Sequence, residues 1–336
     1  MQKIFALTTT VLFFGLSTAP ACIAIAALLL LSAPSNAQTV GYADALGQLG
    51  QSCGTDIAKL CKTVNLGGGR MIQCLNEHSA SVSPACKASV AATSSLLATR
   101  ARARAAVMKV CTPNIVRACP DVKPGDGNLL DCYMKAKHLF SPQCRQTVAD
   151  AGYEAKVDPN TPTTQVALGS ADFVNSLQGV EQAGPAPTAA SLRQMAAQSL
   201  KDPSRTNRMN RAPLVGNLEK RSQLTIAIQF DLNSARINPA SFQAVGLMAD
   251  ALYHPYLQGY RFLVVGHTDG KGNREYNLKL SQQRADAIRE ALINPFGIPP
   301  SRIEAVGLGE EQLLKPADPE AGENRRVQLI NVGPIR

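Results

Sequence analysis

The fold is decided by residues 260–293, which read YRFLVVGHTDGKGNREYNLKLSQQRADAIREALI. The first part, Tyr260 to Val265, is a nearly continuous apolar run that ends at Gly266, as expected of a strand buried on both faces. The second part, from about Asn273 to Ile293, repeats apolar residues with the period of a helix. A buried strand followed by such a helix predicts an α/β sandwich.

The rest of residues 219–336 extends this pattern in both directions. Leu224 to Phe230 alternates like a strand, and Asn238-Pro239 supplies the N-cap and first-turn proline of an earlier helix. Ile303 to Val306 and Arg325 to Val332 are predicted as the last two strands. The order β-α-β-α-β-β predicts a mixed sheet covered by two helices, in a chain of the α+β class.

Three polar residues of the second helix lie where core residues belong. At about 100° per residue, Asn277, Ser281 and Arg284 fall within the apolar stripe of this helix. An unpaired arginine that faces a core is costly, so Arg284 is expected to meet a carboxylate, either of the protein or of a ligand.

A carboxylate stands at the end of the preceding strand. Asp269 follows Gly266-His267-Thr268 at the C-terminal end of that strand, where α/β proteins commonly bind ligands. Asp269 and Arg284 together would bind a zwitterion such as an amino-acid head group, because the carboxylate suits an ammonium and the guanidinium suits a carboxylate. The alternative is a structural Asp269–Arg284 ion pair in which Asp269 caps the helix.

Motifs over about residues 220–332 resemble the C-terminal domain family of outer-membrane protein A (OmpA), shared with Pal lipoproteins and the stator protein MotB. In order, they are Phe230-Asp231 with Asn233-Ser234-Ala235, Gly266 to Gly270, Asn277, Leu280-Ser281, Arg284-Ala285 and Asn324 to Val327. The resemblance implies non-covalent binding of peptidoglycan through the diaminopimelate residue of its stem peptide. It implies that Asp269 and Arg284 hold this residue, that Asn277 assists, and that Asp231 and Arg325 line the same cleft.

The sequence does not predict an enzyme. The stretch from Gly266 to Gly272 is one residue short of a phosphate-binding loop and has Gly272 where a Ser or Thr is required. His267 lies near Asp269, but no Ser or Cys in a nucleophile setting accompanies it. We expect no catalytic residue, no cofactor and no metal.

Eight cysteines reveal an internal duplication. They form two sets of four with spacings of 8, 13 and 12 residues, and the second set follows the first by 58 residues: Cys53, Cys61, Cys74, Cys86 and Cys111, Cys119, Cys132, Cys144. Units of this size bury too little core to be stable unaided, so two disulfides per unit are expected. Zinc is the alternative, but no two thiols have C-x2-C spacing, and His78 and His138 do not occupy equivalent positions.

Three disulfide connectivities are possible within each repeat. Helical-looking stretches around the first and second cysteine pairs flank a glycine-rich turn, Asn65 to Arg70, which suggests a helical hairpin. We therefore expect nested pairs: Cys53–Cys86, Cys61–Cys74, Cys111–Cys144 and Cys119–Cys132. The pattern resembles the cysteine-rich repeat of Golgi-apparatus protein 1, with repeats at about 43–95 and 101–152. That resemblance implies no chemistry, and the partner of this domain is expected to be an unidentified protein.

The N-terminus predicts export. Lys3 precedes an uncharged run from Ile4 to Leu31, and the small residues Ser35-Asn36-Ala37 fit a signal-peptidase site. Residues 1–37 are therefore expected to be a signal peptide. The alternatives are an uncleaved membrane anchor interrupted at Pro20 and lipidation at Cys22.

Composition places limits on the remaining possibilities. The chain has 336 residues, a net charge of +9 and 45% hydrophobic residues, which suits two or three globular domains and excludes a disordered or collagen-like chain. Only the first ~30 residues could cross a bilayer, which excludes a multi-spanning membrane protein. The charge excess lies in residues 38–150, but nucleic acid is not expected for an exported chain.

Residues 153–218 are rich in Pro, Thr, Ala, Gln and Ser and are predicted as a linker with one short helix around Ser191 to Leu200. The alternative is a structured strap packed on the last domain. The whole pattern predicts a peptidoglycan-binding protein of the periplasm or outer membrane of a Gram-negative bacterium, in which a disulfide-stapled helical domain, residues 38–152, engages another partner. A membrane-anchored motor or secretion component that uses the wall as a stator is the alternative.

Overall fold

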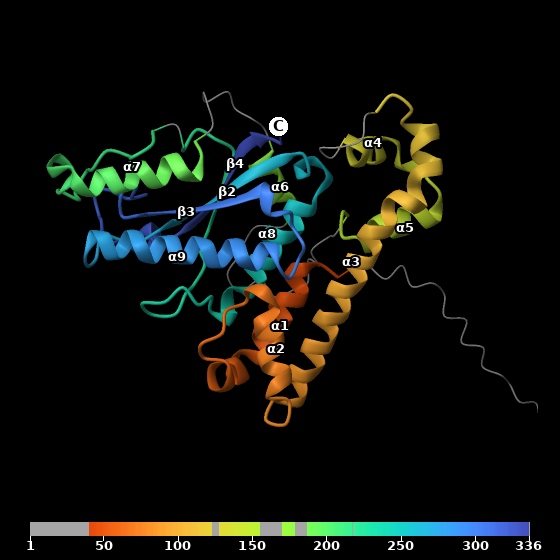
Figure 1. The fold of residues 1–336 in the computed structure, drawn as a ribbon, viewed down its shortest axis with the longest axis horizontal. Helices are drawn as coiled ribbons and strands as arrows, with labels where there is room; N and C mark the ends of the chain where they lie inside the picture. The colour runs from red at the N-terminus through yellow and green to blue at the C-terminus, as the bar shows by residue number, and fades with distance from the viewer. Residues whose placement is uncertain (1–39, 123–127, 155–169, 179–186, 217, 336) are drawn as a thin grey trace, which may run out of the picture. The chain divides into compact units, whose positions relative to one another are not determined.

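A four-stranded mixed sheet forms the centre of the C-terminal domain in the computed structural model, which describes residues 40–122, 128–154, 170–178, 187–216 and 218–335 (Figure 1). The strands are β1 (Gln223–Ile226), β2 (Tyr260–His267), β3 (Ile303–Gly309) and β4 (Val327–Pro334), in the order β1-β4-β2-β3. β2 runs parallel to β3, and β4 is antiparallel to both of its neighbours. The predicted mixed sheet is confirmed, and β2 lies in its interior as its apolar run indicated.

The first strand is shorter than its alternating pattern predicted. β1 ends at Ile226, and Phe230 instead forms an isolated bridge to Ile237. This bridge closes a loop, residues 231–236, in which the backbone N–H of Asp231 donates to the carbonyl of Arg236 at 3.1 Å. The chain therefore leaves the sheet before the motif that begins at Phe230.

Helices cover both faces of the sheet. On one face lie α8 (Phe242–Tyr253) and α9 (Arg274–Ile293), the two predicted helices. On the other face lies α7 (Ala189–Lys201), where Leu192 and Ala196 join a buried cluster with Leu263, Val265 and Leu308 of the sheet. Figure 1 shows α7 and α9 on opposite sides of the strands. The helix expected around residues 191–200 is thus present, and it packs on the C-terminal domain.

The first cysteine-rich repeat packs against α8. It consists of α1 (Tyr42–Leu60), a short turn at Gly67–Gly69, α2 (Arg70–Glu77) and the first part of α3 (Pro84–Ala118). Residues of α1 and α8 belong to one buried cluster, and a Cβ at Gly246 of α8 would lie 2.6 Å from the Cα of Ala43. A glycine is required at this point because the two backbones approach so closely.

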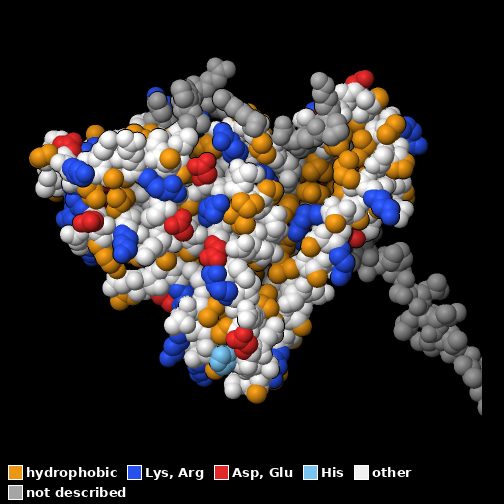
Figure 2. All heavy atoms as spheres, in the orientation of Figure 1, with side chains coloured by type: hydrophobic (Ala, Val, Ile, Leu, Met, Phe, Trp, Pro, Cys, Tyr) orange, Lys and Arg blue, Asp and Glu red, His pale blue; other side chains and the backbone are white. Residues whose placement is uncertain are grey.

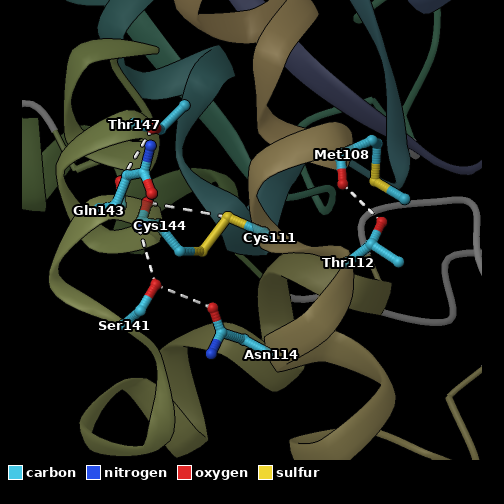
Figure 3. The surroundings of a disulfide bond; sticks show 8 residues. All are labelled: Met108, Cys111, Thr112, Asn114, Ser141, Gln143, Cys144 and Thr147. Carbon is cyan, nitrogen blue, oxygen red and sulfur yellow. Dashed lines mark hydrogen bonds between the residues drawn. A yellow bond between two sulfur atoms is a disulfide. The ribbon is translucent and has the colours of Figure 1, made fainter.

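The second repeat follows on the same long helix. The C-terminal part of α3 continues into α4 (Asn128–Ala136) and α5 (Pro142–Asp150), so a single helix of 35 residues joins the two repeats. Ser141 accepts from the N–H of Cys144 at 3.2 Å and donates to Asn114 at 3.0 Å (Figure 3). Ser83 caps α3 in the equivalent way, with Asp56 as its acceptor.

All four disulfides have the nested connectivity that the sequence predicted. Cys53 pairs with Cys86 and Cys61 with Cys74, and the second repeat pairs Cys111 with Cys144 and Cys119 with Cys132. In each repeat one disulfide joins cysteines that are 13 residues apart in the sequence, and the other joins cysteines that are 33 residues apart. A helical hairpin in each repeat therefore accounts for this one of the three possible connectivities.

A buried ion pair joins the repeats to the C-terminal domain. Arg100 of α3 donates to Asp250 of α8 at 3.0 Å, and both side chains are almost completely buried. The same carboxylate accepts from the N–H groups of Tyr42 and Ala43 at the start of α1, at 3.0 and 2.9 Å. Asp250 thus compensates the positive end of α1 and the Arg100 guanidinium together.

A short helix from the predicted linker also joins this core. α6 (Ser170–Leu177) contributes Phe173 and Leu177, both fully buried, to the cluster that contains α1 and α8. No helix among the described residues combines the length and apolar character needed to cross a bilayer. The expected signal peptide, residues 1–37, lies outside the described residues.

Candidate binding site

A cavity of about 400 Å³ opens at the C-terminal end of β2, beside the first turns of α9. Its lining includes Asp269, Asn277, Arg284 and Arg325, four of the five residues that the sequence assigned to the ligand. The fifth, Asp231, is not among the lining residues, although its neighbours in the 231–236 loop are. The strand-end position expected from the sequence therefore holds a pocket.

Backbone hydrogen bonds on both sides place Asp269 at the edge of this pocket. The N–H of Thr268 donates to the carbonyl of Gly309 at 3.0 Å, and the N–H of Gly270 donates to that of Pro319 at 2.7 Å. The Asp269 carboxylate is largely buried. It accepts from Arg325 at 2.6 Å through one oxygen and from the N–H of Lys271 at 3.2 Å through the other.

Arg284 lies in the same pocket, and no carboxylate of the described residues pairs with it. Its Nε donates to the carbonyl of Ser234 at 3.0 Å, and its guanidinium lies 4.9 Å from the centre of the Phe230 ring. Arg284 forms no ion pair within the part of the chain that the structure describes. Burial lowers the pKa of this guanidinium, although an arginine stays protonated in proteins.

The alternative of a structural pair between Asp269 and Arg284 is therefore not found among the described residues. Asp269 pairs with Arg325, and Asn273 caps α9 by accepting from the N–H of Tyr276 at 3.0 Å. A carboxylate of the protein, one of the two partners expected for Arg284, is not found among the described residues, where a backbone carbonyl and an aromatic face compensate the charge. A carboxylate from a ligand remains as the partner that this position favours.

Asn277 and Asp231 act on the loops around the pocket. The Asn277 amide donates to the carbonyls of Lys271 and Asp269, at 2.8 and 3.3 Å, and to the buried carboxylate of Glu310 at 2.8 Å. Asp231 forms an ion pair with Arg236 at the other end of its own loop. Both side chains therefore hold backbone segments that line the cavity.

The Thr268 hydroxyl is a further polar group in the wall of the pocket. Thr268 lines the pocket, and its buried hydroxyl makes no hydrogen bond to any described residue. Buried polar groups are rarely left unpaired, so a bound molecule or water is the natural partner. His267, one residue earlier, does not line the pocket, and burial lowers its pKa well below the ordinary value of 6.5.

An acidic pair that was not predicted from the sequence lies beneath the site. Glu310 and Glu311 follow β3 directly, and both are fully buried. Burial raises the pKa of Glu311, but hydrogen bonds from Arg274 and Ser199 outweigh this effect and hold the pKa below its usual value. Two consecutive carboxylates after a buried strand were the available signal, because such groups require cations.

Comparison with known proteins assigns two regions of the chain to known families. The model of the OmpA family matches residues 229–326, and the model of a cysteine-rich repeat matches residues 47–83 and 84–139. The peptidoglycan-associated lipoprotein of Pseudomonas putida is 30% identical over 132 residues, which are 38% of this chain and 77% of the lipoprotein. That of Brucella melitensis is 37% identical over 105 residues, which are 31% of this chain and 61% of the lipoprotein.

A porin matches over a smaller share of its length. Outer membrane porin F of Pseudomonas fluorescens is 37% identical over 108 residues, which are 32% of this chain and 32% of the porin. The chain thus spans about a third of the length of that relative.

Domains of the OmpA family are non-enzymatic binding domains, and the domain described here has a pocket that carries opposite charges at the end of a sheet. The chain belongs to the OmpA family, and it carries two cysteine-rich repeats ahead of its OmpA-like domain. Its relatives include outer-membrane and peptidoglycan-associated proteins of Gram-negative bacteria.

Proposed function

We propose that this protein binds peptidoglycan non-covalently and recognises the diaminopimelate residue of the stem peptide. The observation that carries the proposal is the arrangement of Asp269, Arg284 and Arg325 around one cavity, in which no described carboxylate pairs with Arg284. The relatives that are named peptidoglycan-associated lipoproteins support the same ligand.

The free end of diaminopimelate carries an ammonium and a carboxylate on one carbon. Its carboxylate would pair with the Arg284 guanidinium, whose remaining N–H groups suit two carboxylate oxygens. Its ammonium would take the place of Arg325 at the Asp269 carboxylate, which releases the half-exposed Arg325 to the ligand carboxylate. The unpaired Thr268 hydroxyl supplies a further hydrogen bond.

A lysine in the same position of the stem peptide would bind poorly. It has the ammonium but lacks the carboxylate, so the partly buried Arg284 guanidinium would gain no carboxylate partner from it. Discrimination between the two wall types is therefore the property that separates this proposal from general attraction of a basic protein to an anionic polymer.

Co-sedimentation of the full chain with purified sacculi tests the proposal. Sacculi with diaminopimelate and with lysine are compared for the parent, Asp269→Asn and Arg284→Gln. Each substitution removes a charge-assisted hydrogen bond and is expected to weaken binding by about tenfold or more. Equal binding to both kinds of sacculi, or binding that neither substitution changes, would refute the proposed site.

The chain offers a matched control for Arg284→Gln. Arg289 lies on the same helix and also donates its Nε to a backbone carbonyl, that of Ile303, at 2.7 Å. It does not line the cavity. Arg289→Gln is expected to leave binding to the sacculi unchanged, which separates loss of the site from loss of one positive charge.

We place the protein in the periplasm or at the outer membrane of a Gram-negative bacterium. The alternative role as a membrane-anchored stator uses the same wall-binding site, so the two differ at the N-terminus. Gln38 as the first residue of the mature protein would support an exported protein that links the outer membrane or periplasm to the wall. Retention of residues 1–37 would support a membrane-anchored stator.

We further propose that the second repeat contacts a protein partner. Met108, Val116 and Leu139 are large hydrophobic side chains that are about half exposed or more. Figure 2 shows hydrophobic side chains gathered over this repeat, at the upper right. A photoreactive residue at Val116 is expected to cross-link one partner in intact cells, and the same residue at the exposed Lys87 is expected not to.

A further inference from the structure

A segment outside the OmpA-like domain reaches the candidate site. We call residues 199–211 the strap, since they run from the end of α7 over the end of the sheet, and they precede the matched residues 229–326. Arg208 of the strap donates its Nη2 to the carbonyl of Gly272 at 2.7 Å and its Nε to Glu310 at 2.6 Å. Gly272 lines the cavity, so this arginine lies directly behind the pocket wall.

Arg208 is also connected to the loop of residues 270–272 through Glu310 and Asn277. One oxygen of Glu310 accepts from Arg208, and the other accepts from the Asn277 amide at 2.8 Å. That amide also donates to the carbonyl of Lys271 at 2.8 Å. Two consecutive carbonyls, those of residues 271 and 272, are therefore held by one connected set of side chains that begins at Arg208.

The strap itself is anchored by the neighbouring carboxylate. Glu311 accepts from Arg274 at 2.9 Å, and Arg274 also donates to the carbonyl of Ser199 at 3.0 Å. The guanidinium of Arg211 forms ion pairs with both carboxylates, with Nη1 at 3.3 Å from Oε1 of Glu311 and Nη2 at 3.6 Å from Oε1 of Glu310. Buried carboxylates with several cationic partners are costly to separate, so the strap stays in place while the loop is held.

The loop needs this support because of its sequence. Residues 270–272 read Gly-Lys-Gly, and Gly272 has a φ of +87°. Glycines lose more conformational freedom than other residues when they are ordered. A loop that is fixed before the ligand arrives does not lose that freedom on binding, which strengthens binding.

We infer that Arg208 is a positioning residue for the proposed peptidoglycan site, which it serves by fixing the loop of residues 270–272 from outside the OmpA-like domain. This inference rests on the proposed function, because the effect of the loop is expressed as affinity for the ligand. Arg208 acts through Gly272 and Glu310 and does not line the cavity.

Two variants test the inference in the full chain with a soluble muropeptide that contains diaminopimelate. Arg208→Lys keeps a cation beside Glu310 but replaces the planar fork by one ammonium, which cannot serve both acceptors in the same way. Arg208→Gln combined with Glu310→Gln removes both charges, so no buried carboxylate loses its partner. Each variant is expected to bind about three- to tenfold more weakly, the range for one lost hydrogen bond.

Arg205→Gln is the matched control. Arg205 belongs to the same strap and donates to Ser199 and to the carbonyl of Glu311, but none of its hydrogen bonds reaches residues 270–272. It is expected to change the thermal unfolding midpoint and not the affinity. An affinity loss of equal size in Arg205→Gln would mean that general packing of the strap, and not the contact of Arg208 with Gly272, supports binding, and the inference would fail.

Hydrogen exchange of the backbone amides of residues 270–273 gives a readout that needs no ligand. Exchange in this loop is expected to be faster in both Arg208 variants, with the amides of β2 unchanged. Parent-like affinity and parent-like exchange in both variants would overturn the inference. If the parent chain does not bind the muropeptide, the proposed function fails, and the exchange data still decide whether Arg208 holds the loop.

Discussion

Substitution of Asp250 by asparagine is expected to lower the free energy of unfolding by about 3–5 kcal/mol, the range for a buried ion pair that loses one partner. The exposed fractions of the Arg100 and Asp250 side chains are 0% and 1%, so water cannot solvate the guanidinium that is left behind. The Arg100 guanidinium also lies 3.9 Å from the centre of the Tyr42 ring and donates to the carbonyl of Val40 at 2.7 Å. These contacts hold it in place and reduce its freedom to reach solvent.

The structure separates this cost from that of the helix terminus. The amide side chain introduced by Asp250→Asn would retain an oxygen for the N–H groups of Tyr42 or Ala43, so the loss at the start of α1 is at most that of a helix cap, about 1 kcal/mol. Addition of Arg100→Met removes the unpaired charge. The double variant is therefore expected to be more stable than the sum of the single effects predicts, by about 2–3 kcal/mol.

Chemical denaturation of the oxidised full chain, followed by circular dichroism, measures these differences as a double-mutant cycle. Asp286→Asn is the control, since Asp286 is exposed on α9 and accepts a hydrogen bond from Gln282. It is expected to change the free energy of unfolding by less than about 0.5 kcal/mol. A loss below about 1 kcal/mol for Asp250→Asn, or additive single effects, would show that the pair does not hold the repeats on the OmpA-like domain.

Three further perturbations probe other parts of the molecule. The folded-state pKa of His267 lies below its ordinary value, so the unfolded chain binds more protons, and stability should fall below about pH 6.5, by at most ~1.4 kcal/mol per pH unit. His267→Gln should flatten that slope in pH-dependent denaturation, and an unchanged slope would exclude this histidine. Gly246→Ala places a Cβ against Ala43 and should cost about 1–3 kcal/mol in the same assay; a neutral effect would contradict the close packing. Joint replacement of Cys61 and Cys74 by serine opens a bridge 13 residues apart and should cost about 3 kcal/mol, whereas no loss would mean that the bridge is dispensable.

Local patterns in the sequence were sufficient to predict most of the fold. The apolar run of β2, the periodicity of α9 and the cap residues before the helices are properties of contiguous residues, and the structure confirms them. The disulfide connectivity was accessible for a related reason: two helices joined by a short glycine-rich turn leave only nested pairs close together. The error at β1 arose because alternation continues to Phe230, although the chain has already left the sheet.

The candidate site was predictable in its location but not in its pairing. The polar positions of α9 and the strand-end carboxylate indicated where charges gather, and the cavity lies there. Which arginine meets Asp269 depends on distance across the fold, and Arg325, 56 residues away, is the one within reach. From the sequence, either Arg284 or Arg325 could pair with Asp269. Helical periodicity singled out Arg284 because it compares residues of one helix, and Arg325 does not belong to that helix.

The sequence does not tell which residues form long-range ion pairs, since each of the 25 acidic residues has 34 possible basic partners. Burial of an acidic residue greatly reduces the number of possible partners. Carboxylates that directly follow a buried strand, as Glu310 and Glu311 do, cannot remain unpaired, so some segment must bring cations to them. Arg205, Arg208 and Arg211 recur every three residues in a stretch whose composition otherwise indicates a linker. The buried acidic pair and the regularly spaced arginines together would have predicted a strap on the OmpA-like domain. A linker that contacts nothing does not need regularly spaced cations, whereas a segment that packs on buried carboxylates does.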